Sequence, residues 1–290
     1  MPELPEVEIT ARRLTAALEG AEVESALAPG MVTMKSVEPP LSALAGLRVA
    51  GVGRVGKMPY VNFVTGGEAR PSQRLSLLVH LMSAGRLQLF DKRASLKDRR
   101  SRVLVRLPDG RELRLREFGT RQRAWAKLVR TVDLPEEEMV ATLGPEAWPA
   151  PPLDELAKAV DEPRHLHPLL RDQRRIAGIG RSWVDEVLWE ARLSPFKKGN
   201  ELDAEEVERI YDGLTVLGAA LDHYEEVVGD TVPDKLPMPL RVHRREGEPC
   251  PRCATTIEAV YFVEHQTNYC PECQTGGRVL KDRRLSRLLK

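Results

Sequence analysis

The chain has 290 residues, of which 42% are hydrophobic and 30% are charged, and its formal net charge is +1. This length exceeds one small core, so two or three domains are expected. The first residues lack a basic stretch followed by an apolar core, and no apolar run reaches about 18 residues, so neither a signal peptide nor a membrane span is expected. We expect a cytoplasmic protein whose four cysteines form no disulfide scaffold.

The first segment, MPELPEVEITARRLTAALEG, has the pattern of an amphipathic helix. Apolar residues recur at helical spacing from Val7 to Leu18, and acidic residues occupy the first turn, where the helix dipole favours them. Pro5 suits a helix start, because its fixed φ fits the first turn. Pro2 is not explained in this way. If Met1 is removed, which a small second residue permits, Pro2 carries a free secondary amine.

Residues 46–130 read as a series of short strands. Pro108, Asp109 and Gly110 separate two alternating runs, as the turn of a hairpin would. Several short strands with turn signals between them predict an antiparallel sandwich or barrel. The expected strands are LRVAGVGRV, YVNFV, RLSLLVHL, RLQLF, RVLVRL and ELRLR.

The hydrophobic period becomes helical after a Pro-rich stretch at 143–156, which reads as a linker. Helices are expected at 153–160 and 182–193. A long helix is expected after Asp203, which forms a capping box with Glu206. The predicted domains are an N-terminal β-sandwich domain at 1–135, a linker at 136–152, a helical domain at 153–232 and a final module at 241–290.

Charge is distributed unevenly along the chain. Residues 133–162 are acidic, whereas 92–106, 164–181 and 278–290 are basic. Because local concentrations of charge matter more than the total, a polyanionic partner is compatible with a net charge near zero. The basic C-terminal tail fits phosphate contacts, although a solvated polar terminus is an alternative.

The final module contains two Cys-x-x-Cys pairs sixteen residues apart. This spacing suits tetrahedral Zn²⁺ with four thiolate ligands, and the residues between the pairs alternate like a β-hairpin. Such a site has no open coordination position, so the zinc is expected to be structural. Redox-active dithiols and free thiols are the alternatives. The four expected ligands are Cys250, Cys253, Cys270 and Cys273.

A glycine-rich turn, IAGIG, directly precedes the helix expected at 182–193. Gly178 and Gly180 permit a close backbone approach, and a helix N-terminus offers free N–H groups to an anion. No strand precedes the turn, so a dinucleotide fold is not expected. The flanking Arg174, Arg175 and Arg181 favour DNA backbone binding, and a simple tight connection between helices is the alternative.

Several motifs together resemble the formamidopyrimidine/endonuclease VIII (Fpg/Nei) family of DNA glycosylases along nearly the whole chain. They are PELPEVE at the start, GK at 56–57, HL…GRL at 80–87, LGPE at 143–146, DQ…IAGIG…DE at 172–186 and the four-cysteine finger. The resemblance implies an α+β multidomain fold: an antiparallel β-sandwich with an N-terminal helix, a helix–two-turn–helix domain and a zinc-finger hairpin.

The resemblance also implies a bifunctional DNA glycosylase/AP lyase of base excision repair, which removes oxidised or ring-opened bases. Pro2 would attack C1′ of the damaged nucleotide and form a Schiff base, followed by β- and δ-elimination. Glu3 would be the general acid and base, Glu6 a second acidic residue near the site, and Lys57 an aid to elimination that also holds a phosphate. DNA-binding roles fall on His80, Arg121, Arg174, Arg175, Gly178, Gly180, Arg181 and His265.

The sequence departs from the family pattern where DNA is gripped and distorted. Arg181 occupies the position of a phosphate-binding Asn, and His265 that of an Arg in the finger. Ser83 aligns with an intercalating Met, for which the neighbouring Met82 is an alternative, and Gln122 aligns with an aromatic wedge next to Arg121. A polar wedge would fill the vacated base stack less well. These differences indicate a divergent member with its own lesion preference and weaker δ-elimination.

The expected partner is double-stranded DNA that contains a damaged base or an abasic site, bound by a nucleoid-associated monomer with one structural Zn²⁺. Two other hypotheses remain open. One is a damage-binding protein of the same fold with little turnover. The other is a glycosylase for bulky or crosslinked lesions, for which less intrusive wedges would help.

Overall fold

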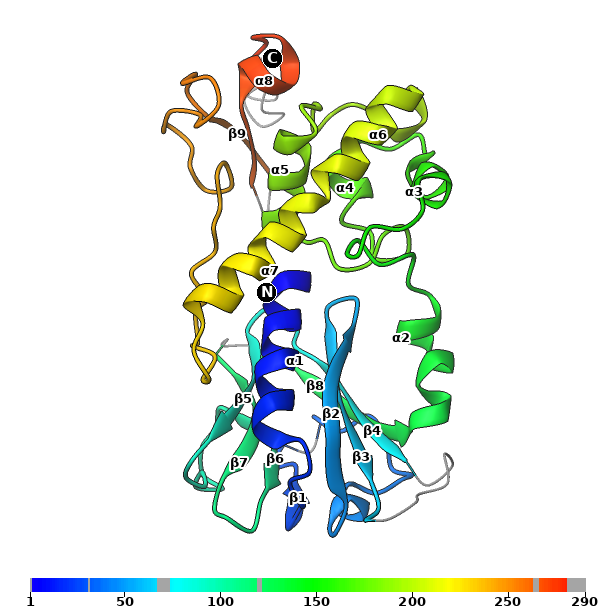
Figure 1. Cartoon of the computed structure of the whole chain (residues 1–290), viewed down its shortest axis with the longest axis vertical. Coiled ribbons are helices and arrows are strands. Elements are labelled where there is room, and N and C mark those ends of the chain that lie inside the picture. The colour runs from blue at the N-terminus through cyan, green and yellow to red at the C-terminus, as the bar shows by residue number, and fades with distance from the viewer. Residues whose placement is uncertain (1, 31, 67–73, 119–121, 263–265, 281–290) are drawn as a thin grey trace. The chain divides into compact units, whose positions relative to one another are not determined.

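The computed structural model describes residues 2–30, 32–66, 74–118, 122–262 and 266–280, and the chain folds into two compact units (Figure 1). The first unit comprises Met1–Thr142 and Tyr224–Pro237, and the second comprises Leu143–His223 and Met238–Lys290. We describe each unit by itself. Among the described residues, no helix has both the length and the apolar character needed to cross a membrane.

Two four-stranded antiparallel sheets form the first unit. One has the order β2-β3-β4-β8 and the other β1-β6-β7-β5. Buried side chains of both sheets, such as Val61 and Leu77 from one and Val103 and Leu115 from the other, belong to a single hydrophobic cluster. The sheets therefore share one core, which confirms the predicted antiparallel fold. The strands are β1 (Ser25–Leu27), β2 (Arg48–Val55), β3 (Met58–Val64), β4 (Leu75–His80), β5 (Gly85–Phe90), β6 (Ser101–Arg106), β7 (Glu112–Glu117) and β8 (Trp125–Arg130).

The six strands expected from alternation are all present, from β2 to β7. The hairpin predicted at Pro108–Gly110 joins β6 and β7, whose register pairs Val105 with Leu113. Two strands were not among those named from the sequence. β1 is only three residues long, and β8 (WAKLVR) mixes charged and apolar positions, so neither has a strong alternating signal.

Strand register brings several strand ends to one edge of the sandwich. His80 at the end of β4 pairs with Trp125 at the start of β8, and Gly85 at the start of β5 pairs with Glu117 at the end of β7. β4 and β5 are joined by a short turn in which the Gly85 N–H donates to the Leu81 carbonyl at 2.7 Å. The two sheets therefore present these ends on the same side.

Helix α1 (Leu4–Leu18) begins at that same edge. Its Thr15 hydroxyl donates to the Val52 carbonyl at 3.0 Å, and Glu8 accepts from Arg54 Nε at 2.9 Å. The N-terminus of α1 therefore lies toward the end of β2, near the β2–β3 turn at 56–57. We call this side of the sandwich the N-terminal edge.

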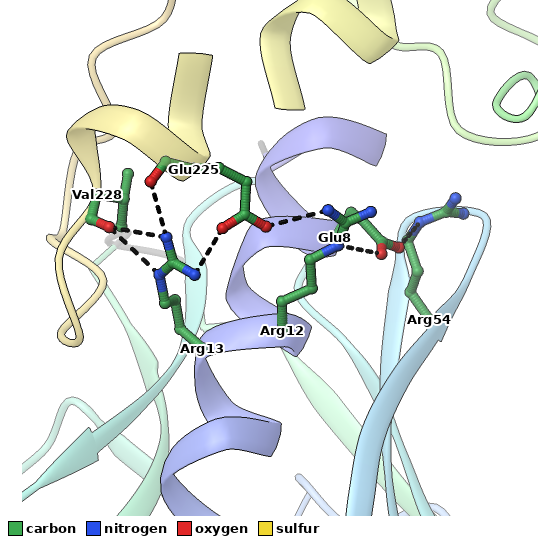
Figure 2. A network of polar contacts seen from close by, with 6 residues as sticks. All are labelled: Glu8, Arg12, Arg13, Arg54, Glu225 and Val228. Carbon is green, nitrogen blue, oxygen red and sulfur yellow. Dashed lines mark hydrogen bonds and ion pairs between the residues drawn. The ribbon is translucent and has the colours of Figure 1, made fainter. Parts of the chain in front are cut away.

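A polar network holds α1 to the rest of the first unit (Figure 2). Glu8 bridges Arg12 and Arg54, each at 2.9 Å. Glu225 accepts from Arg12 at 3.0 Å and from Arg13 at 2.6 Å. This network fixes the outer face of the helix that carries the candidate catalytic residues.

The second unit is mainly helical and contains the cysteine module. The expected helices at 153–160 and 182–193 are present as α3 (Leu153–Val160) and α5 (Arg181–Glu190), with the short α4 (Leu166–Leu169) between them. The module consists of β9 (Glu258–Tyr261), β10 (Gln266–Tyr269) and α8 (Pro271–Thr275), and its two strands pair antiparallel, as the alternation predicts. Shorter elements are α2 (Glu138–Ala141) and 3₁₀ turns at Leu41–Leu44, Thr131–Glu136 and Gly199–Glu201.

The single long helix expected after Asp203 is wrong in one respect. Its start is correct, since Asp203 accepts from the Glu206 N–H at 2.8 Å in a capping box. However, two helices follow, α6 (Ala204–Gly213) and α7 (Thr215–Val227). The Thr215 hydroxyl donates to the Asp212 carbonyl at 2.5 Å at this junction. Such side-chain bonds compete with the helical backbone pattern.

Candidate active site, DNA-binding turn and zinc centre

The start of α1 gathers the first candidate catalytic residues. Pro2 is buried and directly precedes Glu3, which is the N-cap residue of α1. Glu3 is also buried, with 2% of its surface exposed. Glu6 accepts from the Glu3 N–H at 2.9 Å through one carboxylate oxygen and from the Tyr224 hydroxyl at 2.8 Å through the other. Glu6 thus fixes the backbone next to Pro2, a role that the sequence did not reveal.

Lys57 and His80 lie on the N-terminal edge as well. His80 stacks on Trp125 with ring centroids 5.4 Å apart, and its Nδ1 accepts from the Met82 N–H at 3.1 Å. Burial, assisted by the nearby positive charge of Lys57, lowers the pKa of His80. His80 is therefore a neutral imidazole, whose bond with Met82 needs an unprotonated Nδ1.

The residues aligned with intercalating wedges have different surroundings. Ser83 is exposed, and Met82 adopts a left-handed φ of 49°. Gln122 is held in place: it accepts from Arg102 Nη1 at 2.9 Å and donates to the Arg99 carbonyl at 2.6 Å. Arg121 lies outside the described residues.

An exposed aromatic residue at the N-terminal edge was missed. Phe118 directly follows β7 and is 38% exposed. The guanidinium groups of Arg116 and Arg100 lie 4.7 and 5.5 Å from the centroid of its ring. The signal in the sequence was an aromatic residue at a strand end, followed by Gly119.

The glycine-rich turn has the predicted form in the second unit. Gly178 has a φ of +102°, which other residues rarely adopt. Its N–H donates to Gln173 Oε1 at 3.0 Å, and Gln173 Nε2 donates to the Ile179 carbonyl at 2.9 Å. Gly180 is the N-cap of α5, and Arg181 is its exposed first residue. The turn therefore places the exposed Arg181 at the N-terminus of α5.

The two preceding arginines differ from each other. Arg174 is exposed, whereas Arg175 forms an ion pair with Glu162. Arg174 is therefore the better placed of the two to meet a phosphate. His265 lies outside the described residues.

The four cysteines form one metal site. Their sulfur atoms all lie within 4.8 Å of one another, with Cys250 3.9 Å from Cys273 and Cys253 3.4 Å from Cys270. Tetrahedral Zn–S bonds of about 2.3 Å require sulfur atoms roughly 3.8 Å apart, so the donor set fits Zn²⁺. The site is one structural Zn²⁺ centre with four cysteine ligands, as predicted.

Helix α5 supports the zinc centre. Trp189 Nε1–H donates to the Cys250 sulfur at 3.3 Å, and the guanidinium of Arg252 stacks 3.9 Å from the Trp189 ring. Buried Glu186 accepts the N–H groups of Val242 and His243, each at 2.9 Å. Such contacts outside the ligand shell orient the ligands.

Family models match three consecutive parts of the chain. The family model described as "Formamidopyrimidine-DNA glycosylase N-terminal domain" matches residues 1–122, and "Formamidopyrimidine-DNA glycosylase H2TH domain" matches 143–229. "Zinc finger found in FPG and IleRS" matches 247–276.

Individual relatives agree with these matches. A formamidopyrimidine-DNA glycosylase of Roseiflexus sp. is 33% identical over 288 residues, which cover 94% of this chain and 100% of that protein. The structure of Thermus thermophilus MutM (Fpg) is 30% identical, with a TM-score of 0.75 and coverage of 94% of this chain and 98% of that one. Lactococcus lactis Fpg in complex with DNA containing N7-benzyl-Fapy-dG is 26% identical, with a TM-score of 0.79 and coverage of 94% and 100%. The chain belongs to the formamidopyrimidine-DNA glycosylase family.

Proposed function

We propose that this protein is a bifunctional DNA glycosylase/AP lyase of base excision repair with Pro2 as its nucleophile. After removal of Met1, the secondary amine of Pro2 attacks C1′ of the damaged nucleotide, and the bond from C1′ to the base breaks. An α-amino group titrates near pH ~8, so part of it is neutral and nucleophilic at pH 7. The observation that carries the proposal is Pro2 beside a buried carboxylate, Glu3, at a backbone fixed by Glu6.

The remaining steps use groups at the N-terminal edge. Glu3 exchanges a proton with the sugar ring oxygen, a role typically worth about 10²–10⁴-fold in rate. The resulting iminium acidifies the C2′ proton, so β-elimination follows and δ-elimination can complete strand scission. Lys57 assists elimination and holds a phosphate. Glu6 acts through its contacts with the Glu3 backbone and with Tyr224, which makes it a positioning residue.

The lesion leaves the base stack to reach Pro2, at a cost of a few kcal/mol. Phe118 is better suited than Gln122 to fill the vacated stack, because Phe118 is an exposed aromatic ring and Gln122 is held by two hydrogen bonds. His80 contributes a neutral donor or acceptor beside the extruded nucleotide. Arg121 retains its proposed place opposite the orphaned base.

The helical domain and finger grip the DNA backbone in this proposal. The Gly178–Gly180 turn lets the DNA backbone approach the N-terminus of α5, where the helix dipole favours an anion, and Arg181 and Arg174 supply charge. His265 is the proposed phosphate contact of the finger, and Arg175 contributes only if its ion pair with Glu162 opens. The protein acts as a monomer on duplex DNA in the nucleoid.

The substrate is duplex DNA with an oxidised or ring-opened base, or an abasic site. The Lactococcus relative was crystallised with a lesion that carries a benzyl group, which supports including bulky lesions in a substrate panel. Product ends resolved on a gel for 8-oxoguanine, formamidopyrimidine, oxidised pyrimidine, abasic and crosslinked duplexes would rank the candidates. A protein that binds all of them and cleaves none would be a damage-binding protein.

Borohydride trapping tests the nucleophile. The native protein with an abasic-site duplex should give a covalent adduct, because borohydride reduces the iminium to a stable amine. Pro2→Gly should greatly weaken the adduct while duplex binding is retained. Pro5→Gly is the matched control, since it also removes a proline from this segment but leaves the amine of Pro2 in place. An adduct that forms equally well in Pro2→Gly and that peptide mapping places away from position 2 shows that the nucleophile is another residue.

A further inference from the structure

The basic segment at 92–106 has no role in the chemistry described above. Part of it lines an open depression on the first unit, with a volume of about 500 Å³. Three cations line this depression: Lys97, Arg99 and Arg102. Lys97 and Arg99 are exposed, and within the described part of the chain neither side chain forms an ion pair.

The one acidic residue in the lining does not neutralise these cations. Asp98 accepts from the Ser101 hydroxyl at 2.8 Å and from the Arg100 N–H at 3.0 Å, so its carboxylate shapes the loop. The depression therefore has an excess of positive charge. The side chains of Lys97 and Arg99 donate to no acidic group among the described residues.

Arg102 is the most constrained of the three cations. Its Nη1 donates to Gln122, and its Nε is buried without a hydrogen-bond partner among the described residues. Gly30 lies directly against it, since a Cβ at that position would be 2.8 Å from Arg102 Nη1. Arg102 is thus a fixed positive charge in the lining of the depression, and a guanidinium held in this way favours an anionic ligand.

The depression also lies at the N-terminal edge. Ser101 starts β6 and pairs with Arg116 near the end of β7, next to the exposed Phe118. Arg100, in the same loop, is 5.5 Å from the ring of Phe118. By contrast, Lys92 follows the end of β5 at Phe90, which pairs with Glu112 at the opposite edge. The loop between β5 and β6 therefore runs from the opposite edge to the N-terminal edge of the sandwich, with basic residues along its length.

We infer that Lys97, Arg99 and Arg102 form a further binding site for the phosphodiester backbone of duplex DNA, on the catalytic domain and close to Phe118. This inference rests on the proposed function. Arginine and lysine donors in an open basic depression suit phosphate oxygens, and each neutralised phosphate releases condensed counterions. The site would hold the DNA backbone close to Phe118, where the lesion leaves the base stack.

The salt dependence of DNA binding tests this site. Lys97→Gln/Arg99→Gln should bind a duplex several-fold more weakly than the native protein. The slope of log K against log salt should lose about 1.8 in magnitude, because each phosphate contact contributes roughly 0.9. The matched control is Arg48→Gln/Lys92→Gln, which removes two positive charges from the opposite edge of the same domain and should leave the slope unchanged. Equal slopes in the native protein and both variants, or equal losses in both variants, would overturn the inference.

Two further measurements separate this site from the catalytic proposal. Gly30→Ala should displace the Arg102 guanidinium and weaken binding, while the free energy of unfolding changes little. At saturating DNA, Lys97→Gln/Arg99→Gln should reach the same final extent of borohydride trapping as the native protein. If the native protein forms no adduct, the catalytic proposal fails, whereas the salt slopes still report on the phosphate site.

Discussion

Glu6 shows how much a single side chain can organise at the proposed active site. Its two carboxylate oxygens contact the Glu3 N–H and the Tyr224 hydroxyl, which belong to segments more than two hundred residues apart in the sequence. Burial, with a further contribution from the charge of Glu6, raises the pKa of Tyr224 far above its usual value. The phenol therefore stays protonated and always donates this bond.

Tyr224→Phe should lower the free energy of unfolding by about 1–3 kcal/mol, because a buried carboxylate oxygen loses its hydroxyl donor. The same variant should slow borohydride trapping, since the backbone next to Pro2 becomes less fixed. Urea unfolding and single-turnover trapping measure the two effects. Tyr211→Phe is the control, because Tyr211 is 36% exposed. Matching results for the two variants would show that the Tyr224 hydroxyl contributes nothing.

His80 should make the stability depend on pH in a defined direction. Its pKa is lowered in the folded protein, chiefly by burial, so the unfolded chain binds more protons between the folded pKa and the ordinary value near ~6.5. Stability from this residue is complete above that range and is lost as the pH falls through it. His80→Gln should therefore lose less stability between pH 7 and pH 5 than the native protein. Parallel stability curves from urea unfolding would contradict this.

At the scale of elements, α5 combines two functions in ten residues. Its N-terminus carries the glycine turn and Arg181, whereas Asp185, Glu186 and Trp189 hold the segments around the zinc centre. Asp185 accepts from His243 Nδ1 at 2.7 Å and from the Asn268 N–H at 3.0 Å. One helix therefore links the glycine-rich turn, which we propose binds phosphate, to the metal module within the second unit.

Glu186→Gln should destabilise the second unit by about 1–3 kcal/mol, because the amide would turn a donor toward one of three backbone N–H groups and leave it unsatisfied. Those donors are the N–H groups of Arg241, Val242 and His243, at 3.0, 2.9 and 2.9 Å. Glu208→Gln is the control, because it makes the same substitution at an exposed position on α6. Thermal unfolding measures both, and an unchanged midpoint in Glu186→Gln would show that these bonds do not hold the segment.

At the scale of the whole molecule, the chain builds separate cores. The sandwich core contains residues of α1 and of both sheets, and a distinct cluster surrounds Trp189 and the cysteines. Metal binding and folding of the finger are coupled, because the ligands of a structural zinc site are brought together only on folding. The sandwich does not depend on the metal in this way.

Cys270→Ser should lose the zinc and most of the DNA affinity, while amide hydrogen exchange in β3 and β4 stays as slow as in the native protein. Metal analysis, duplex binding and exchange measured on the same preparation give the three results. A variant that is free of zinc yet binds DNA normally would show that the finger does not need its metal for binding. Faster exchange in β3 and β4 would show that the two cores are not independent.

The sequence predicted those elements whose pattern is local. Six strands, the hairpin at 108–110 and the Asp203 cap follow from alternation, turn residues and capping chemistry over a few neighbouring positions. It did not predict β8, the division between α6 and α7, or the exposure of Phe118. β8 depends on a neighbour that is distant in the chain, because it pairs with β4, whereas the division between α6 and α7 coincides with the local bond from Thr215 to Asp212.

The sequence by itself predicted the four zinc ligands, because two Cys-x-x-Cys pairs at this spacing suit a tetrahedral Zn²⁺ site. It also determined the motif at the start of the chain, from which the proposed chemistry of Pro2 and Glu3 follows. Only the tertiary structure decided that Glu6 bonds Tyr224, that Gln122 is held by Arg102, and that three cations of the 92–106 segment line one depression. The physical reason is that hydrogen bonding and burial depend on which side chains meet in space, and residue order alone does not specify those meetings.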